Sequence, residues 1–266
     1  MGSVRKLISE TIAHLDRMNR HIYIIVFFGA LFLHADMQGQ SRNNNTDAQK
    51  KFIRFYFEAE RHKLTEDYSQ AIVEYEKCIS TIPEESSPYY QIGKLYLYFF
   101  NDITSSEYYI NEAISLDPTN LWFYYDLITI YTIQNNNIQK QKTYEKLISL
   151  DPENQAYYFE NTKALIELKE YRSAIRFIKK LEKKFGISNE SLILLKDIYL
   201  AQNNLREAEK IGKKLAERST VLYAVLAEIY MYFSDYEKAI IAYNKLLEFF
   251  PSNPTALIAL HKIYNN

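Results

Sequence analysis

The sequence predicts an all-α fold, and three observations lead to this prediction. The chain has 266 residues, of which only six are glycine and six are proline, and this low number of helix breakers disfavours β-sandwiches and loop-rich α/β folds. The hydrophobic fraction of 47% is large enough for a packed core. Apolar residues recur with the spacing of a helix face, for example at Ile92, Leu95, Tyr96 and Phe99.

The helices are expected to come in pairs, because several residue types recur about every 34 positions. Pro83, Pro118 and Pro152 are 35 and 34 residues apart. Proline inside a helix costs about 3 kcal/mol, so these residues mark junctions between units. The same period is kept by tyrosines and alanines, namely Tyr96, Tyr131, Tyr199, Tyr230, Tyr264, Ala71, Ala174, Ala208 and Ala239. A unit of this length accommodates two helices of about 12–14 residues each.

These residues resemble the tetratricopeptide repeat, whose pattern is W-x2-L-G-x2-Y on a first helix, A-x3-F on a second and a closing proline. The best match is the segment 220–253, through Tyr223, Leu226, Ala227, Tyr230, Ala239, Tyr243 and Pro251. The resemblance implies a right-handed superhelical solenoid of helix hairpins. Its repeats are expected at 52–85, 86–120, 121–154, 155–188, 189–219 and 220–253, with a terminal helix at 254–264. The junction sequence EKLISLDPENQAYYFE is similar to those of exported members of the family from Bacteroidetes-type bacteria.

Three repeats depart from the family pattern. The fourth ends at Gly186 instead of proline, and the fifth is shortened to 31 residues. The third has Lys140 where a small residue, such as Ala174 or Ala208, would let the two helices approach closely. We therefore expect the third hairpin to be packed less closely than the others.

The resemblance also implies a concave groove, lined by the first helices, that receives a peptide or a helix of a partner protein. The family's groove positions fall here on Tyr56, Gln91, Leu95, Tyr98, Trp122, Tyr125, Phe159 and Lys163, with Glu60, Thr129, Ile193, Asp197, Ala224 and Glu228 as further members. Tryptophan and tyrosine are common at binding hot spots, but with 24 tyrosines in the chain some would face a groove by chance. Chaperone-binding members of the family bind a C-terminal carboxylate through Lys, Asn and Arg at fixed groove positions. Here residues such as Ile92 and Asp126 occupy those positions, so binding of a chaperone C-terminus is not expected.

The sequence gives no sign of catalysis or of a cofactor. No G-x-G-x-x-G, P-loop, H-E-x-x-H or G-x-S-x-G motif occurs. The single cysteine, Cys78, excludes an intramolecular disulfide and a cysteine-based zinc site, and its position predicts a core residue. His62 and His261 are expected to be packing residues, and the formal net charge of −1 argues against nucleic-acid binding. We expect a non-enzymatic protein with no cofactor, metal or small-molecule substrate.

A short apolar segment near the N-terminus predicts export. Residues 22–33, IYIIVFFGALFL, follow Arg17 and Arg20 and precede a small-residue exit at Ala35 or Gly39, which is typical of a signal peptide. A membrane-spanning helix needs about 20 apolar residues. Residues 1–40 are therefore expected to be a signal peptide, with Met18 as an alternative start, or else a short anchor. Residues 41–51 are expected to be a polar linker.

The sequence thus predicts a protein–protein interaction scaffold in the periplasm or cell envelope of a bacterium, binding a peptide or partner protein in its groove. The alternative is a regulatory or sensory module of a signalling or assembly complex, anchored in the inner membrane. The sequence leaves two further interactions undecided. One is membrane association through the N-terminal apolar segment. The other is self-association through the helix 254–264, whose Leu257 and Leu260 have no second helix to cover them.

Overall fold

The computed structural model describes residues 42–265, and within this range the chain forms thirteen α-helices, α2 to α14, and no β-strand. The helices form six hairpins and a terminal helix. The first helices are α2 (Arg42–Leu64), α4 (Ser86–Leu95), α6 (Leu121–Ile133), α8 (Gln155–Glu167), α10 (Asn189–Ala201) and α12 (Tyr223–Tyr232). The second helices are α3 (Tyr68–Thr81), α5 (Ile103–Leu116), α7 (Asn137–Leu150), α9 (Tyr171–Phe185), α11 (Leu205–Arg218) and α13 (Tyr236–Phe249), and α14 (Pro254–Tyr264) follows.

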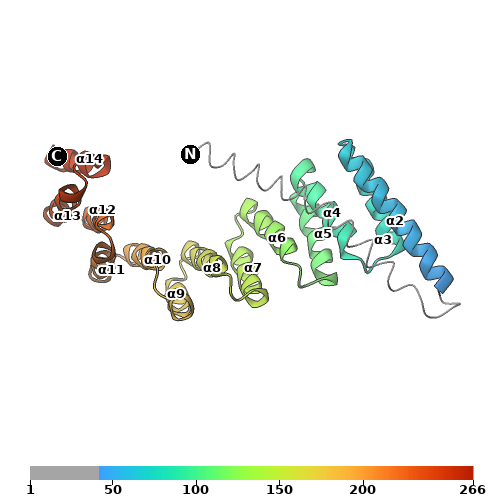
Figure 1. Cartoon of the computed structure of the whole chain (residues 1–266), viewed down its shortest axis with the longest axis horizontal. Coiled ribbons are helices and arrows are strands. Elements are labelled where there is room, and N and C mark those ends of the chain that lie inside the picture. The colour runs from blue at the N-terminus through green and yellow to red at the C-terminus, as the bar shows by residue number, and fades with distance from the viewer. Residues whose placement is uncertain (1–41, 266) are drawn as a thin grey trace.

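The hairpins are stacked in chain order into one elongated, curved row (Figure 1). Helices pack almost entirely against their neighbours in the chain. From α6 to α13, the first helix of each pair lies on the inner side of the curve and the second on the outer side (Figure 1). The core is accordingly a series of local clusters shared by adjacent hairpins; one of them joins Ala59, Tyr75 and Ile92. This is the superhelical, all-α solenoid that the sequence predicts.

Each hairpin turn has the same backbone design. In each turn one residue adopts a left-handed backbone conformation. In chain order these residues are Glu66, Asn101, Asn135, Lys169, Asn203 and Ser234. In the fourth hairpin the backbone N–H groups of Lys169 and Glu170 donate to the carbonyls of Ile166 and Leu165, both at 2.9 Å, which closes the end of α8. The next residue is the N-cap of the second helix, and in five of the six turns its side chain accepts a hydrogen bond from a backbone N–H.

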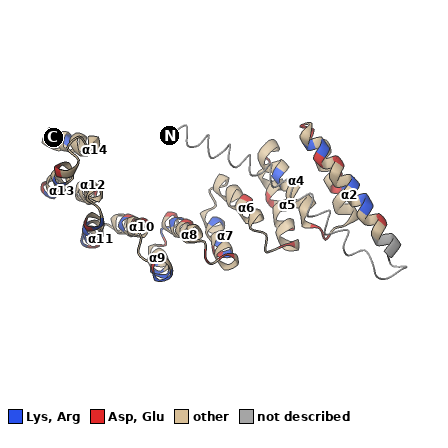
Figure 2. Cartoon of the chain, in the orientation of Figure 1, with Lys and Arg blue, Asp and Glu red and all other residues tan. Residues whose placement is uncertain are grey.

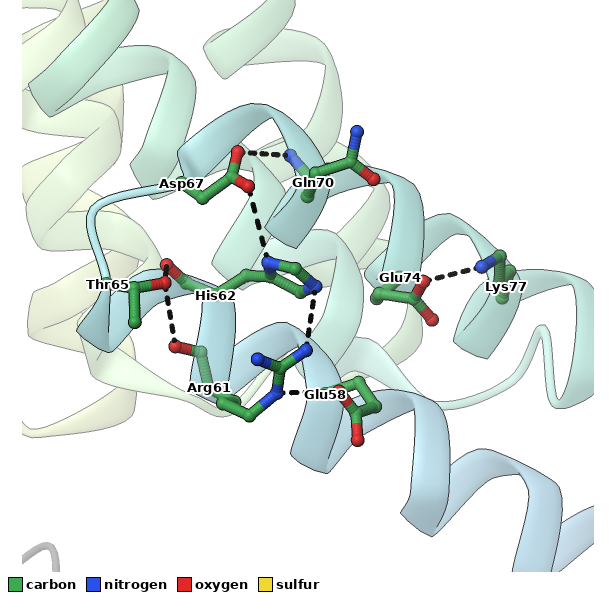
Figure 3. A network of polar contacts seen from close by, with 8 residues as sticks. All are labelled: Glu58, Arg61, His62, Thr65, Asp67, Gln70, Glu74 and Lys77. Carbon is green, nitrogen blue, oxygen red and sulfur yellow. Dashed lines mark hydrogen bonds and ion pairs between the residues drawn. The ribbon is translucent and has the colours of Figure 1, made fainter.

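The first of these turns carries a local polar network (Figure 3). Asp67 accepts a hydrogen bond from the backbone N–H of Gln70 at 3.3 Å and lies 3.5 Å from Nδ1 of His62. Arg61 donates to Glu58 at 2.8 Å on the exposed side of α2. The side chain of His62 is only 20% exposed at the edge of the turn, in agreement with its interpretation as a packing residue.

Small residues occupy the same buried position near the start of four second helices. Ala71, Ala174, Ala208 and Ala239 are fully buried, and so is Cys78, as its position predicts. Gly186 has a φ of 87°, a conformation that other residues rarely adopt, so glycine replaces proline at this junction. Lys140 takes the small-residue position of the third hairpin, and its ammonium reaches Glu167 of the next repeat at 2.6 Å.

Two local features differ from the sequence-based expectation. Helix α2 begins at Arg42, so residues 42–51 are helical and do not form the expected linker. Once the packed part of α2 from Phe52 onward has nucleated the helix, extending it costs little per residue. The second feature is η1 (Tyr96–Phe100), a π-helical turn that continues α4.

The π-helical turn accommodates one extra residue in the second repeat. The left-handed residue Asn101 follows the first residue of α4, Ser86, by 15 positions. In the third repeat the corresponding residue, Asn135, follows Leu121 by only 14 positions. The backbone N–H of Asp102 consequently reaches back six residues, to the carbonyl of Tyr96 at 3.0 Å. The spacing of 35 residues between Pro83 and Pro118, instead of 34, is thus explained by the extra residue in η1, at the end of α4.

Candidate partner-binding face

The predicted groove residues differ widely in exposure. Trp122 and Tyr98 are 64% and 53% exposed, and Lys163 is exposed but paired with Glu160 at 2.5 Å. Four others are half-buried, namely Tyr56, Gln91, Tyr125 and Phe159. Leu95 is only 1% exposed. Its assignment to the groove is therefore wrong, because it belongs to the core.

The error at Leu95 is one of helical register. Gln91 and Leu95 follow Tyr56 and Glu60 by 35 residues, but the extra residue of the second repeat lies later, in η1. The position of Leu95 in its helix corresponds to buried positions in the four repeats that follow, namely Ile130, Ala164, Ile198 and Ile229. With the register corrected, the residues of α4 that correspond to Trp122, Tyr125 and Thr129 are Ser87, Tyr90 and Lys94.

The corrected register gives one equivalent residue on each first helix. These residues are Tyr56, Tyr90, Tyr125, Phe159, Ile193 and Ala224, all half-buried, and we call them the inner row. Its first four members are aromatic and the last two are aliphatic. Tyr90 is the member that sequence reasoning missed, although its spacing of 34 residues from Tyr56 and 35 from Tyr125 could have revealed it.

Inner-row residues contact the next first helix along the array. Ser87 donates to the Tyr56 hydroxyl at 2.8 Å, and the ring of Tyr90 lies 4.6 Å from that of Phe123. The hydroxyls of Tyr125 and Tyr157 are hydrogen-bonded to each other. Trp122 contacts Tyr125 edge to face at 5.6 Å but remains mostly exposed. The aromatic part of the face therefore both joins the repeats and presents surface to solvent.

A second set of contacts bridges the same helices at the next register position. Lys63 Nζ donates to Oε1 of Gln91 at 2.9 Å, and Tyr98 donates to Oδ1 of Asp126 at 2.5 Å. Both bridges span 28 residues, and their members are equivalent, since Tyr98 follows Lys63 by 35 residues and Asp126 follows Gln91 by 35. The first bridge contains an ammonium group and the second does not.

Burial keeps the tyrosines of this face in their hydrogen-donating form. Desolvation raises the pKa of Tyr56 to about 12. The pKa of Tyr98 is raised by desolvation and by its hydrogen bond to Asp126. The pKa of Tyr157 is raised by desolvation and by its hydrogen bond to Tyr125. All three phenols are therefore neutral at physiological pH.

Charge is distributed unevenly among the helices. Charged residues are frequent on the outer helices α7, α9 and α11, whereas α6 is almost free of them (Figure 2). Asp126 is the one charged residue of α6 and is only 8% exposed. The middle of the inner face is thus aromatic, with a single carboxylate beneath its surface.

Other surfaces of the described residues offer less definite sites. An open depression of about 760 Å³ lies between α7 and α9, lined by residues such as Gln141, Arg176 and Phe177. No group of three or more His, Cys, Asp or Glu side chains in residues 42–265 could hold a metal ion. On α14, Leu257, Ile258 and Tyr264 are exposed, and self-association through this helix stays a prediction.

Comparisons with known proteins agree with this geometry. Residues 221–253 match the family model of the tetratricopeptide repeat. A solved tetratricopeptide repeat protein from Parabacteroides merdae has 17% identity and a TM-score of 0.51, and the match covers 80% of this chain and 86% of that one. The chain has a tetratricopeptide-repeat fold. Both the family resemblance and the fold class read from the sequence are confirmed.

Two further solved structures are similar to this chain. A chain of the Naa15/Naa10 complex bound to HypK-THB has 12% identity and a TM-score of 0.63; the match covers 84% of this chain but only 34% of that one. YrrB, described as a tetratricopeptide-repeat protein with an unusual peptide-binding site, has 18% identity and a TM-score of 0.47, with 70% and 97% of the two chains covered. Among curated proteins, none matches the sequence.

Proposed function

We propose that this protein is a non-enzymatic scaffold that holds a peptide or a segment of another protein against the inner face of α4, α6 and α8. The observation that carries the proposal is the exposure of Trp122 on this face, beside Tyr125, which belongs to the inner row with Tyr90 and Phe159. A large aromatic side chain left in water is unfavourable, and such residues dominate the binding energy of protein interfaces.

The architecture supports this proposal. First helices on the inner side of a curve present a concave surface to an extended or helical segment, and the inner row repeats along that surface. A partner of ordinary size would cover about 800 Å² of it. A similar fold occurs in a protein complex, that of Naa15/Naa10 with HypK-THB. No cofactor or metal enters the proposed mechanism, which consists of non-covalent burial of aromatic surface.

Site-specific crosslinking in cells tests the proposal. A photoreactive phenylalanine analogue is placed at Trp122, and the matched control places it at Ile241, which is 68% exposed on the outer helix α13. We expect a discrete crosslinked protein from position 122 and none from position 241. The same products from both positions, or none from position 122, would contradict binding at the inner face.

We further propose that the scaffold works in the cell envelope after export. The support comes from the apolar segment 22–33, which lies outside the described residues. Among residues 42–265, no helix combines the length and apolar character needed to cross a bilayer. N-terminal sequencing of the protein isolated from cells discriminates between the two forms. A start after residues 35–40 supports the exported form, and an intact leader supports the membrane-anchored regulatory module.

A further inference from the structure

Asp126 lies beneath the inner face with half of its hydrogen-bonding capacity unused. Its Oδ1 accepts from Tyr98 at 2.5 Å, whereas its Oδ2 is buried and has no hydrogen-bond partner. Buried carboxylates are normally paired with a cation or surrounded by donors, because an uncompensated buried charge is costly. The side chain is 92% buried, since its exposure is 8%, so water compensates this charge poorly.

The neighbours of Asp126 are aromatic and exposed. Trp122 precedes Asp126 by four residues on α6, so the two side chains are neighbours on one face of the helix. Tyr98, more than half exposed, approaches from the preceding repeat and covers the carboxylate. Aromatic ring faces attract cations, most strongly when the cation is removed from water. Two exposed rings beside a buried carboxylate form a suitable environment for a positively charged group.

The first repeat shows the same position with a cation in place. There the ammonium of Lys63 donates to Gln91, the counterpart of Asp126, at 2.9 Å and to Glu60 at 3.0 Å. The same ammonium lies 5.8 Å from the ring of Tyr75. In the second repeat the chain supplies the neutral Tyr98 instead of a lysine, while the acceptor changes from a neutral amide to a carboxylate. At the contact between the second and third repeats, Asp126 is therefore an acceptor suited to a cation, but the residue at the position of Lys63 is the neutral Tyr98.

The π-helical turn explains how Tyr98 comes to be placed there. Residues 96–100 form η1, and Tyr98 is its central residue. The extra residue shifts the end of the first helix by one position, so that Tyr98, and not Leu97, is the counterpart of Lys63 in its spacing and its contact. Leu97 is buried in the core. Single π-helical turns are frequent at functional sites.

We propose that Asp126, Tyr98 and Trp122 form a pocket for one basic side chain, lysine or arginine, of the bound partner. This inference rests on the proposed function and adds the chemistry of one partner residue to it. The Tyr98 side chain rotates and uncovers Oδ2 of Asp126. The cationic group then donates to Oδ2 the hydrogen bond that this oxygen lacks, and it packs against the rings of Tyr98 and Trp122.

The fluorescence of Trp122 allows a direct test, because this residue is the single tryptophan of the chain. The probe is the capped peptide Gly-Gly-Arg-Gly-Gly, titrated at constant ionic strength against the same peptide with citrulline in place of arginine. We expect a saturable fluorescence change with the arginine peptide and a much weaker one with the isosteric, uncharged peptide. Identical titrations with the two peptides would overturn the proposal.

Three variants separate the pocket from general electrostatic attraction. Asp126→Asn keeps the acceptor for Tyr98 but removes the charge, and it is expected to weaken arginine-peptide binding at least about tenfold. Glu237→Gln, which removes a carboxylate from an exposed position of the outer helix α13, is the matched control and should bind as the wild type does. Tyr98→Phe frees both oxygens of Asp126 and should bind the arginine peptide at least as tightly as the wild type. Unchanged binding by Asp126→Asn, or loss of binding in Glu237→Gln, would exclude the pocket.

The outcome is independent of the crosslinking experiment. If position 122 captures a partner but the arginine and citrulline peptides behave alike, the scaffold function stands and the basic-residue pocket is wrong. If the arginine peptide binds through Asp126 but no partner is captured from position 122, the pocket stands and the proposed scaffold function is contradicted.

Discussion

The hydroxyl of Tyr124 donates a 2.8 Å hydrogen bond to the carbonyl of Pro118, six residues earlier. Tyr158 and Pro152 repeat this relationship one unit later, at 3.1 Å. In both repeats the tyrosine is buried and closes the junction between one hairpin and the next. At each junction the proline carbonyl thereby gains a donor from the first helix that follows it, and the Pro152 carbonyl also accepts from Lys184.

Replacement of Tyr124 by phenylalanine should therefore destabilise the array. The Pro118 carbonyl would lose its donor while the ring stays packed, and we expect a loss of about 1 kcal/mol. Urea unfolding monitored by circular dichroism measures the effect. Tyr108→Phe, at an exposed position of α5, is the control and should leave the midpoint unchanged. Equal midpoints for Tyr124→Phe and the wild type would show that the hydrogen bond contributes nothing.

Gly93→Ala should destabilise the second hairpin in spite of the better helix propensity of alanine. A Cβ atom at Gly93 would lie 2.7 Å from Cγ1 of Ile110 and 3.3 Å from two backbone atoms of α5. Propensity favours alanine by about 1 kcal/mol, whereas overpacking of this kind costs about 1–3 kcal/mol. Thermal melting of Gly93→Ala, Ile110→Ala and the double variant forms a cycle. The proposed clash is refuted if Gly93→Ala is equally costly in both backgrounds.

The thiol of Cys78 should be almost unreactive in the folded protein. It is fully buried on α3 and lies 3.6 Å from the carbonyl of Phe52, and desolvation raises its pKa to about 12. Labelling by a disulfide reagent at pH 8 is therefore expected to follow opening of the first hairpin, and to accelerate sharply in denaturant. The control is Cys78→Ala/Ser80→Cys, whose thiol is exposed and should react at once. Rapid labelling of native Cys78 would contradict the packing of α2 on α3.

Glu209 should contribute to the pH dependence of stability. Its hydrogen bond with Lys213 and a second one from Tyr230 lower its pKa in the folded state. A carboxyl with a lowered folded-state pKa stabilises above the pKa of the unfolded chain, and this contribution is lost as the pH falls through the folded-state value.

The wild type should accordingly lose stability between about pH 5 and pH 3 more steeply than Glu209→Gln. Chemical unfolding at a series of pH values measures the difference. Glu237→Gln, at an exposed position of α13, should keep the slope of the wild type. Parallel curves for the wild type and Glu209→Gln would rule out the contribution.

The helical register of the first helices shows how far sequence reasoning reaches. The positions of Trp122 and Tyr125 in α6 agree with the family spacing, because the third repeat follows the family pattern at the start of its first helix. The position of Leu95 does not agree with that spacing, because the 35-residue period does not show where in the repeat the extra residue lies. The extra residue lies in η1, and its location there depends on how Leu97 and Tyr98 pack against the next hairpin.

The sequence also did not predict which polar residues are buried. Asn161 is fully buried where the two preceding repeats have Ile92 and Leu127, and Gln141 of α7 donates to its side chain at 3.0 Å. Asp126 is likewise buried, although its residue type predicts exposure. A contact between residues 20 or 28 positions apart leaves no periodic trace in a single sequence.

The sequence by itself determined the helices, their pairing and the repeat fold, because helix spacing and helix stops are local properties of a few neighbouring residues. The tertiary structure alone decided which side of each first helix meets solvent and which side chains bridge successive repeats. These depend on the rotation and spacing of one helix relative to the next, and so on the packing of several side chains at once. In this protein that packing left Oδ2 of Asp126 without a donor beneath an exposed tyrosine.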